Sequence, residues 1–338
     1  MLILGIETSC DETAVAVVEN GGKIHSNLVA SQVELHKQFY GVVPEVASRK
    51  HLEVILLLLD KALKKAGICL KDLNAVGVTI GPGLLGSLLV GVTVAKGVAL
   101  SLNIPFVGIN HLEAHLYAGL IQNPSFYPPF VGLIISGGHT ELVYLSEKKE
   151  CELLGSTRDD AVGEAFDKIA RALDLGYPGG PIIEKIAKKG DPYKIKFPLP
   201  HFKEEGTLDF SFSGLKTAVI YKIKEMRDKK LRIPVEDIAA GFQLQVANII
   251  LDRIKKAVSL RKVKRVIIGG GVASNKFIKD FLFRNLEDVD LLIPPPELCT
   301  DNAAMVAALA YEKVKRGEIS SLSVEAQANL GIGINNIG

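Results

Sequence analysis

The segment "INHLEAHLYAGL" (Ile109 to Leu120) carries two histidines four residues apart, His111 and His115. In a helix, such residues project from one face one turn apart, so both imidazoles can bind one metal ion. Glu113 lies two residues after His111 and would point to nearly the opposite side, whereas a zinc-protease helix carries its glutamate directly after the first histidine. The segment therefore predicts a metal site without the general base of a metalloprotease.

A metal site needs a third ligand to be credible, because a histidine pair alone is more often incidental than metal-binding. Asp301, in "CTDNAAM", begins the last helix-like segment, at the position that "NHLEAH" occupies in the first half. We expect it to reach the histidines from the second half. The alternative is a helix cap, a role that Thr300, Asp301 and Asn302 all favour. Two histidines and one carboxylate suit iron or zinc, and Lewis-acid chemistry on a carbonyl or phosphoryl oxygen.

Asp11 and Glu12 form an acidic pair in the turn between the first two strand-like segments. Aspartate is common in such turns for structural reasons alone. Beside a Gly-rich phosphate site, however, carboxylates often orient a metal or a water, or act as a base. Both residues are therefore candidate catalytic residues.

The elements that position these residues occur twice along the chain. Each half opens with three strand-like segments, "LILGIE", "AVAVVE" and "KIHSNLVAS" in the first and "FVGLIIS", "LVYLS" and "CELLGST" in the second. Each half ends with a helix, a strand, a Gly-rich loop ("GPGLLGS" or "VASN"), a helix, a strand and a final helix-like segment. This repetition predicts a duplicated α/β fold with mixed sheets covered on both faces. The Gly-rich loops should lie at the carboxyl ends of strands, where such folds bind ligands.

Length and composition agree with a globular protein of two domains, since 338 residues exceed what one core usually spans. The formal net charge of +2 demands no nucleic acid, but local basic runs can contact phosphate. Two candidates are "RDKKLR" (Arg227 to Arg232) and "RKVKR" (Arg261 to Arg265), for each of which a solvated helix end is the simpler explanation.

The chain shows no sign of a signal peptide or a membrane span. Its first residues turn polar after a short apolar run, and the longest apolar stretch is broken by Lys96, Asn103 and Pro105. The four cysteines are far apart and form no CxxC pair, which favours reduced thiols. We expect a cytoplasmic protein.

Six motifs resemble the TsaD family of tRNA N6-adenosine threonylcarbamoyltransferases, once called glycoproteases, over essentially the whole chain. They are "GIETSCDET", "NHLEAH", "SGGHTEL", "DFSFSGLKTAV", "GGGVASN" and "CTDNAAM". The resemblance implies the actin-like ATPase (ASKHA) fold, with two duplicated RNase H-like domains around a central cleft. We expect these domains at residues 1–128 and 129–317, with the tail from about 318 to 338 packing back onto the first.

The resemblance also implies a reaction and its residues. Threonylcarbamoyl would pass from threonylcarbamoyl-AMP to N6 of adenosine 37 in tRNAs that read codons beginning with A. The family's metal ligands fall on His111, His115 and Asp301. Its substrate-binding positions fall on Ile134, Ile135, Ser136, Gly137, Gly138, Asp167, Gly180, Glu184 and Asn275. Glu184 stands where many relatives carry aspartate. Lys216 is a candidate contact to tRNA phosphate or substrate, or simply a solvated lysine.

The expected ligands and partners follow from the same resemblance. They are one divalent metal ion (Fe2+ before Zn2+), tRNA, a TsaB-like paralogue as heterodimer partner, a TsaE-like ATPase and an upstream threonylcarbamoyl-AMP synthase. ATP or ADP is a further expected ligand. One alternative is a phosphotransferase or ATPase of the same fold, which would need Mg2+ and no histidine pair. Another is a non-catalytic scaffold like the shortened paralogue, which lacks the histidines and the aspartate.

Overall fold

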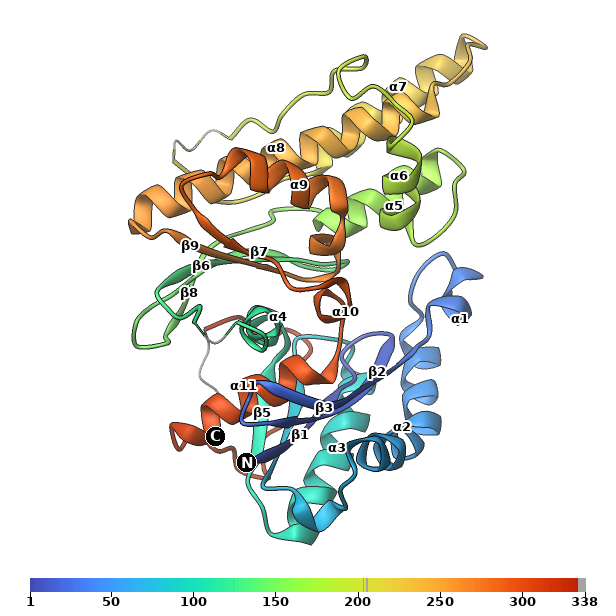
Figure 1. Cartoon of the computed structure of the whole chain (residues 1–338). Helices are drawn as coiled ribbons and strands as arrows, with labels where there is room; N and C mark the ends of the chain where they lie inside the picture. The colour runs from blue at the N-terminus through green and yellow to red at the C-terminus, as the bar shows by residue number, and fades with distance from the viewer. Residues whose placement is uncertain (124, 203, 205, 334–338) are drawn as a thin grey trace. The chain divides into compact units, whose positions relative to one another are not determined.

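The chain forms two compact units, Met1–Tyr127 with Thr300–Gly338, and Pro128–Cys299. The computed structural model describes residues 1–338 except 124, 203, 205 and 334–338 (Figure 1). Each unit is built on one five-stranded mixed sheet. The duplication predicted from the sequence is therefore confirmed.

The first sheet has the strand order β3-β2-β1-β4-β5. Its strands are β1 (Leu2–Glu7), β2 (Glu12–Glu19), β3 (Lys23–Ser31), β4 (Ala75–Gly81) and β5 (Phe106–Asn110). β1, β2 and β3 pair antiparallel as a meander, while β1, β4 and β5 run parallel. The parallel strands end at one edge, so Glu7 at the end of β1 and His111 directly after β5 lie at that same edge.

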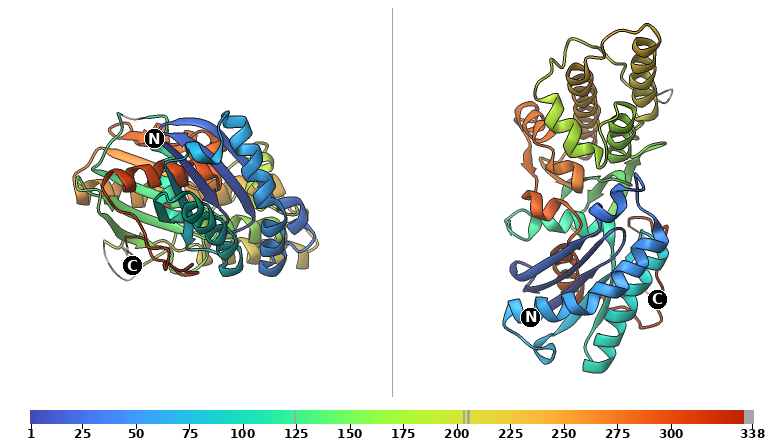
Figure 2. Two further views of the ribbon diagram at one scale, coloured as in Figure 1. Left: turned by 90° about the horizontal axis from the view of Figure 1, so that it is seen from below. Right: turned by 90° about the vertical axis from the view of Figure 1, so that its right-hand side faces the viewer.

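Helices cover both faces of this sheet (Figure 2). On one face, α2 (Pro44–Ala66) and α3 (Leu85–Leu102) share a core with the apolar residues of β1 and β4. On the other face, α11 (Ala303–Lys315) packs against the same two strands. The unit is completed by α1 (Val33–Lys37), η1 (Leu70–Asp72) and α4 (His111–Leu120).

Glycines let α11 approach the first sheet closely. A Cβ on Gly5 would lie 2.2 Å from the carbonyl oxygen of Ala303, and a Cβ on Gly77 would lie 2.5 Å from Cβ of Ala310. Neither position accepts a side chain unless α11 moves. Because alternate residues of a strand share a face, Glu7 lies on the same face as Gly5, toward α11.

The compact units differ from the domains expected from the sequence at α11, which lies in the first unit although the expected second domain extends to residue 317. The buried alanines of α11 match the glycines of the first sheet, whereas periodicity marks an apolar face without saying which sheet it covers. Within the described part of the tail, residues 318–333 pack on the first unit. There, the backbone N–H of Ser320 donates to Phe106 O at 2.8 Å, and that of Gln327 donates to Ile80 O at 2.7 Å.

The second sheet repeats the first, with the order β10-β9-β6-β7-β8. Its strands are β6 (Phe130–Ile135), β7 (Thr140–Leu145), β8 (Cys151–Ser156), β9 (Arg265–Gly269) and β10 (Asp290–Leu292). Again the first three strands pair antiparallel, and the last two continue the sheet in parallel.

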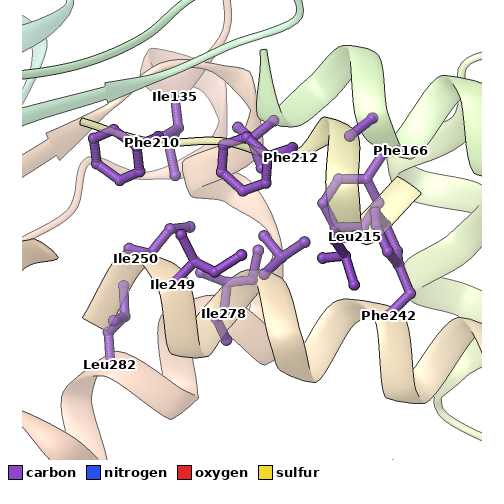
Figure 3. Packing of buried hydrophobic residues seen from close by; sticks show 14 of the residues in the cluster. Ile135, Phe166, Phe210, Phe212, Leu215, Phe242, Ile249, Ile250, Ile278 and Leu282 are labelled. Carbon is purple, nitrogen blue, oxygen red and sulfur yellow. The ribbon is translucent and has the colours of Figure 1, made fainter. Parts of the chain in front are cut away.

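The helices of the second unit surround an aromatic core. They are α5 (Val162–Ala172), α6 (Gly179–Ala187), α7 (Ser213–Asp228), α8 (Val235–Arg261), η2 (Gly271–Ser274), α9 (Lys276–Asn285) and α10 (Pro296–Cys299). Phe166 of α5 and Phe242 of α8 meet edge to face with ring centroids 5.0 Å apart. Phe210 and Phe212 pack above α8 (Figure 3). In chain order, α5, α6 and α7 stand where the first unit has α1.

A carboxylate distant in sequence caps α7. The N-cap residue Phe212 has no side chain that can cap, but Asp159 Oδ1 accepts the backbone N–H of Phe212 at 2.8 Å and that of Ser213 at 3.1 Å. Burial alone would raise the pKa of Asp159, but these bonds and those from the Ser211 and Ser213 hydroxyls lower it. The loop before α5 thereby holds the start of α7.

One described helix, α3, is long and apolar enough to cross a membrane, with a mean hydropathy of 1.8. Its residues Val92, Ala95 and Ala99 are buried in the core of the first unit. The core helix of a globular protein has the same composition, so this helix is weak evidence for a membrane span.

Candidate functional site

His111 and His115 lie at the start of α4, at the carboxyl edge of the first sheet. The helix begins at His111 because Asn110 caps it, its side chain accepting two backbone N–H groups of the first turn. The two imidazoles meet edge to face, with centroids 4.7 Å apart. The spacing in the sequence therefore places both rings on one face, as predicted.

Asp301 joins the two histidines from the segment before α11. Asn302 caps that helix by accepting the N–H of Met305 at 3.1 Å, so Asp301 is not the cap. Its Oδ1 lies 3.2 Å from His115 Nε2 and 3.6 Å from His111 Nε2. We expected Asp301 to reach the histidines from the second half. That route is wrong, because the residue belongs to the first unit.

The chemistry of this group fits a divalent cation. One donor atom from each of the three residues lies within 4.8 Å of the others. His111 is 5% exposed and His115 is 0% exposed. Among the described residues, neither ring nitrogen of His115 has a hydrogen-bond partner. Leaving buried nitrogens unsatisfied beside a carboxylate is costly unless a cation joins them, and two imidazoles with one carboxylate are a common donor set for such an ion.

Glu7 supports this group, and sequence analysis missed it. Its Oε2 accepts from Thr79 Oγ1 at 2.6 Å and lies 3.0 Å from His111 Nδ1, while its Oε1 accepts the N–H of Ser9 at 2.6 Å. A carboxylate on Nδ1 leaves Nε2 of His111 available to a metal. The available signal was a charged residue closing the apolar strand "LILGIE", but its complete burial is visible only in the structure.

Glu7 and His111 stabilise each other's charged forms. Burial opposes charge on both groups, but the attraction between them outweighs it. The pKa of Glu7 is therefore lowered, and Glu7 together with Asp301 raises the pKa of His111 to about 9.

Asp11 and Glu12 lie beyond the end of β1 in the same unit. Asp11 is 8% exposed, and Glu12 Oε1 accepts the Ser31 hydroxyl at 3.1 Å. Burial raises the pKa of Glu12 to about 9, and the charges of Asp301 and Asp11 add to this rise. A carboxyl group with that pKa keeps its proton at neutral pH, whereas a nearby cation would favour the carboxylate.

Glu113 forms a hydrogen bond with the C-terminal tail of the chain. Its Oε1 accepts the backbone N–H of Gly333 at 3.2 Å. The expectation that this residue is no metalloprotease base agrees with this contact.

The substrate-binding residues expected in the second unit begin at the end of β6. A Cβ on Gly270, whose φ is 93°, would lie 2.4 Å from Ile135 O, and a Cβ on Gly163 would lie 2.6 Å from Ser136 O. The loops after β6 and β9 and the start of α5 therefore touch. Ile134 and Ile135 are completely buried, so neither offers an exposed surface to a ligand in this structure.

Several glycines leave room around these loops. At Gly137, Gly138, Gly180 and Gly271, an added Cβ would meet nothing within 4 Å. A ligand can approach the backbone closely at such positions.

Three polar residues of the expected substrate set hold neighbouring elements. Asp167 Oδ1 accepts the N–H of Gly179 at 2.6 Å, Glu184 Oε1 accepts the N–H of Lys276 at 3.3 Å, and Asn275 Oδ1 caps α9 through the N–H of Ile278 at 3.0 Å. Burial raises the pKa of Asp167 despite its bond to Gly179. These residues thus join α5, α6 and α9 around the loops.

Lys216 is engaged within the second unit. Its ammonium pairs with Asp160, whose other oxygen accepts from Lys168 at 2.5 Å. Burial alone would raise the pKa of Asp160, but the two lysines lower it. Lys216 is therefore part of the support of α7.

Comparisons with known proteins agree with this geometry. The family model of TsaD, described as tRNA N6-adenosine threonylcarbamoyltransferase, matches residues 23–308. Proteins of that name from Clostridium kluyveri and Clostridium perfringens are 51% and 48% identical, each over 98% of this chain and 98% of the relative.

Solved structures support the fold. HypF from T. kodakarensis superposes with a TM-score of 0.66 at 17% identity, over 93% of this chain and 48% of HypF. Component A of the (R)-2-hydroxyglutaryl-CoA dehydratase from Acidaminococcus fermentans gives 0.56 at 16% identity, over 93% and 99%. The neighbours share the actin-like ATPase fold, which confirms the expected fold class.

Proposed function

From the premise that this chain belongs to the TsaD family and is a tRNA N6-adenosine threonylcarbamoyltransferase, we propose how its own residues serve the reaction. The donor is threonylcarbamoyl-AMP, and the acceptor is N6 of adenosine 37 in tRNAs that read codons beginning with A. The N6 amine attacks the carbamoyl carbon, the bond from that carbon to the phosphate oxygen breaks, and AMP leaves.

His111, His115 and Asp301 would hold one divalent metal ion. The observation that carries this assignment is the convergence of two buried imidazoles and a carboxylate, with the nitrogens of His115 unsatisfied. We favour Fe2+ over Zn2+ because two histidines and one carboxylate with open positions are typical of non-haem iron. When bound, the ion supplies a Lewis acid that polarises a carbonyl oxygen.

The loops of the second unit would bind the nucleotide part of the donor. Backbone N–H groups of Ser136 to Gly138 and of Gly271 suit phosphate oxygens, and the missing side chains leave space for them. Asp167, Glu184 and Asn275 would position these loops, since each bonds a neighbouring element. ATP or ADP would use the same loops.

Asp11 or Glu12 would accept the proton that N6 loses. Both carboxylates lie in the same unit as the three proposed metal ligands, and the charge of Asp301 influences Glu12. Adenosine 37 belongs to the anticodon loop, so its amine is available without breaking a duplex.

The proposed partner is a TsaB-like paralogue, bound through α2 and α3. On these packed helices, Leu52 and Leu56 are 69% and 64% exposed, and Leu85 and Leu89 are 49% and 48% exposed. Such an apolar face is typical of a protein interface. Leu52→Glu should abolish capture of the paralogue, whereas Leu100→Glu, at the far end of α3, should not. A TsaE-like ATPase and a donor synthase would complete the pathway, in the cytoplasm.

Depletion of the protein tests the function. Threonylcarbamoyladenosine in bulk tRNA should fall and return with the wild-type gene. Rescue with His111→Ala should fail. Unchanged modification after depletion would contradict the transferase assignment, and full rescue by His111→Ala would remove the metal from the mechanism. ATP hydrolysis by the purified chain with Mg2+, without tRNA, would favour the phosphotransferase alternative.

A further inference from the structure

Two basic runs are candidates for contact with tRNA, and the fold separates them. We define the basic tip as residues 222–232, the last turns of α7 and the start of its connection to α8. It carries six basic and two acidic side chains. The second run, Arg261 to Arg265, joins the other end of α8 to β9.

The course of α8 shows which run lies on the side of the proposed substrate loops. Gln243 of α8 accepts a hydrogen bond from Asn275, just beyond the carboxyl end of β9, at 2.9 Å. Val235, the first residue of α8, precedes Gln243 by eight residues, or about 12 Å of helix. Lys262 follows Gln243 by nineteen residues, or about 28 Å in the opposite direction. The basic tip therefore lies on the side of the loops, and the second run lies at the far edge of the sheet.

The basic tip also carries positive charges that its own acidic residues do not neutralise. Glu225 pairs with Lys222 at 3.0 Å and Lys229 at 2.6 Å, and these two ammonium groups lower its pKa to about 2. In contrast, the exposed Lys224 and Lys230 have no acidic partner among the residues that the structure describes.

An aromatic side chain accompanies these charges. Tyr221 is 67% exposed, about one helical turn before Lys224 on α7. Exposed aromatic rings stack on unpaired bases, and lysines beside them meet the phosphates of the same strand. Basic residues at the end of a helix also offset its dipole, but an exposed tyrosine is not needed for that purpose.

We propose that the basic tip binds the tRNA substrate, with Lys224 and Lys230 contacting backbone phosphates and Tyr221 stacking on an unpaired base. This proposal rests on tRNA being the substrate. It also gives a role to Asp159 and Asp160, which lie before α5 and hold the first turn of α7. The basic tip lies at the other end of α7, so these contacts fix the helix that carries it.

The test compares two matched double variants. Lys224→Gln with Lys230→Gln removes two charges from the tip. Lys262→Gln with Lys264→Gln is the control and removes two exposed charges from the other run. The two variants are matched in backbone conformation as well, because Lys230 and Lys262 are both left-handed, with φ of 53° and 52°. Each full-length chain is added to an extract from bacteria depleted of their own family member, and threonylcarbamoyladenosine formation is followed against the concentration of an ANN-decoding tRNA transcript.

The tip variant should lower kcat/KM for tRNA on the order of tenfold at 0.1 M salt, through KM, and should reduce the slope of log kcat/KM against log salt by about 1.4. The control variant should match the wild type. A wild-type value for the tip variant, or an equal loss in the control, would overturn the proposal. If the wild-type chain forms no threonylcarbamoyladenosine, the function itself fails and the tip proposal falls with it. Tyr221→Ala should raise KM in the same way, and Tyr221→Phe should not.

Discussion

Glu7→Gln tests the proposal that Glu7 prepares His111 to bind a metal. Three groups converge on the carboxylate of Glu7: the Ser9 N–H, the Thr79 hydroxyl and His111 Nδ1. The glutamine oxygen must stay with Ser9, because a backbone N–H can only donate. Its NH2 group then faces Thr79, whose hydroxyl can turn to accept, and His111. The imidazole can accept at Nδ1 only by carrying its proton on Nε2, where that proton blocks a metal.

The expected loss follows from this change of tautomer. Removing such a support costs about 10- to 100-fold in metal affinity, which equals about 1.4 to 2.7 kcal/mol. Because glutamine fills the same volume and leaves no unpaired charge when His111 is neutral, the variant should still fold, although the lost charge attraction should lower its melting temperature. Bound Fe2+ or Zn2+ per chain is measured by elemental mass spectrometry after equilibration with graded metal buffers, and folding is followed by circular dichroism.

Glu19→Gln is the matched control. Glu19 also pairs with a histidine, His25 at 2.9 Å, but at 35% side-chain exposure and distant from the three ligands in the sequence. Its substitution should leave metal binding unchanged. Wild-type metal affinity in a folded Glu7→Gln protein would refute the argument that Glu7 directs the proton of His111.

Three further changes test the packing and the site. Gly5→Val should lower the free energy of unfolding by about 1 to 3 kcal/mol or more. The reason is that a Cβ at this position would lie 2.2 Å from Ala303 O and displace α11. Chemical denaturation measures this loss. Asp159→Ala should lower the melting temperature at pH 7. Its cost should be greatest above about pH 3.9, the ordinary pKa of aspartate, and should shrink as the pH falls through the lowered pKa of Asp159, because protonation removes the charged cap. Glu113→Ala should leave metal affinity unchanged, because that carboxylate bonds the tail. Gly22→Ala, with 3.4 Å to the nearest atom, is a control for the first change.

For each of these changes, one result would contradict the prediction. Wild-type stability in Gly5→Val would show that α11 can move away without loss. A deficit in Asp159→Ala that does not shrink as the pH falls through the lowered pKa of Asp159 would point to a cause other than the charged cap. Loss of metal in Glu113→Ala would return this glutamate to the site.

Local order could be read from the sequence because short-range rules govern it. The strands of both halves, the long helices before β4 and β9, and the spacing of His111 and His115 follow from apolar periodicity and turn residues. The segment between β8 and α8, with α5, α6 and α7, has no counterpart of that length in the first half, so the repeat did not predict it.

The proposed metal group shows what these short-range rules do not predict. Asp301 was identified from its place in the repeat, but its route was wrong, because close packing of Gly5 and Gly77 against α11 assigns that helix to the first sheet. Glu7 was missed because it resembles an ordinary charged strand end until its burial is known.

By itself, the sequence determined the order of the elements, the duplication, the family and the residues able to bind a metal, because these depend on neighbours along the chain and on recurring motifs. Only the tertiary structure decided which sheet α11 covers, which carboxylate supports His111 and which basic run lies on the side of the loops after β6 and β9. Those outcomes depend on contacts between residues far apart in the chain, which spacing does not encode.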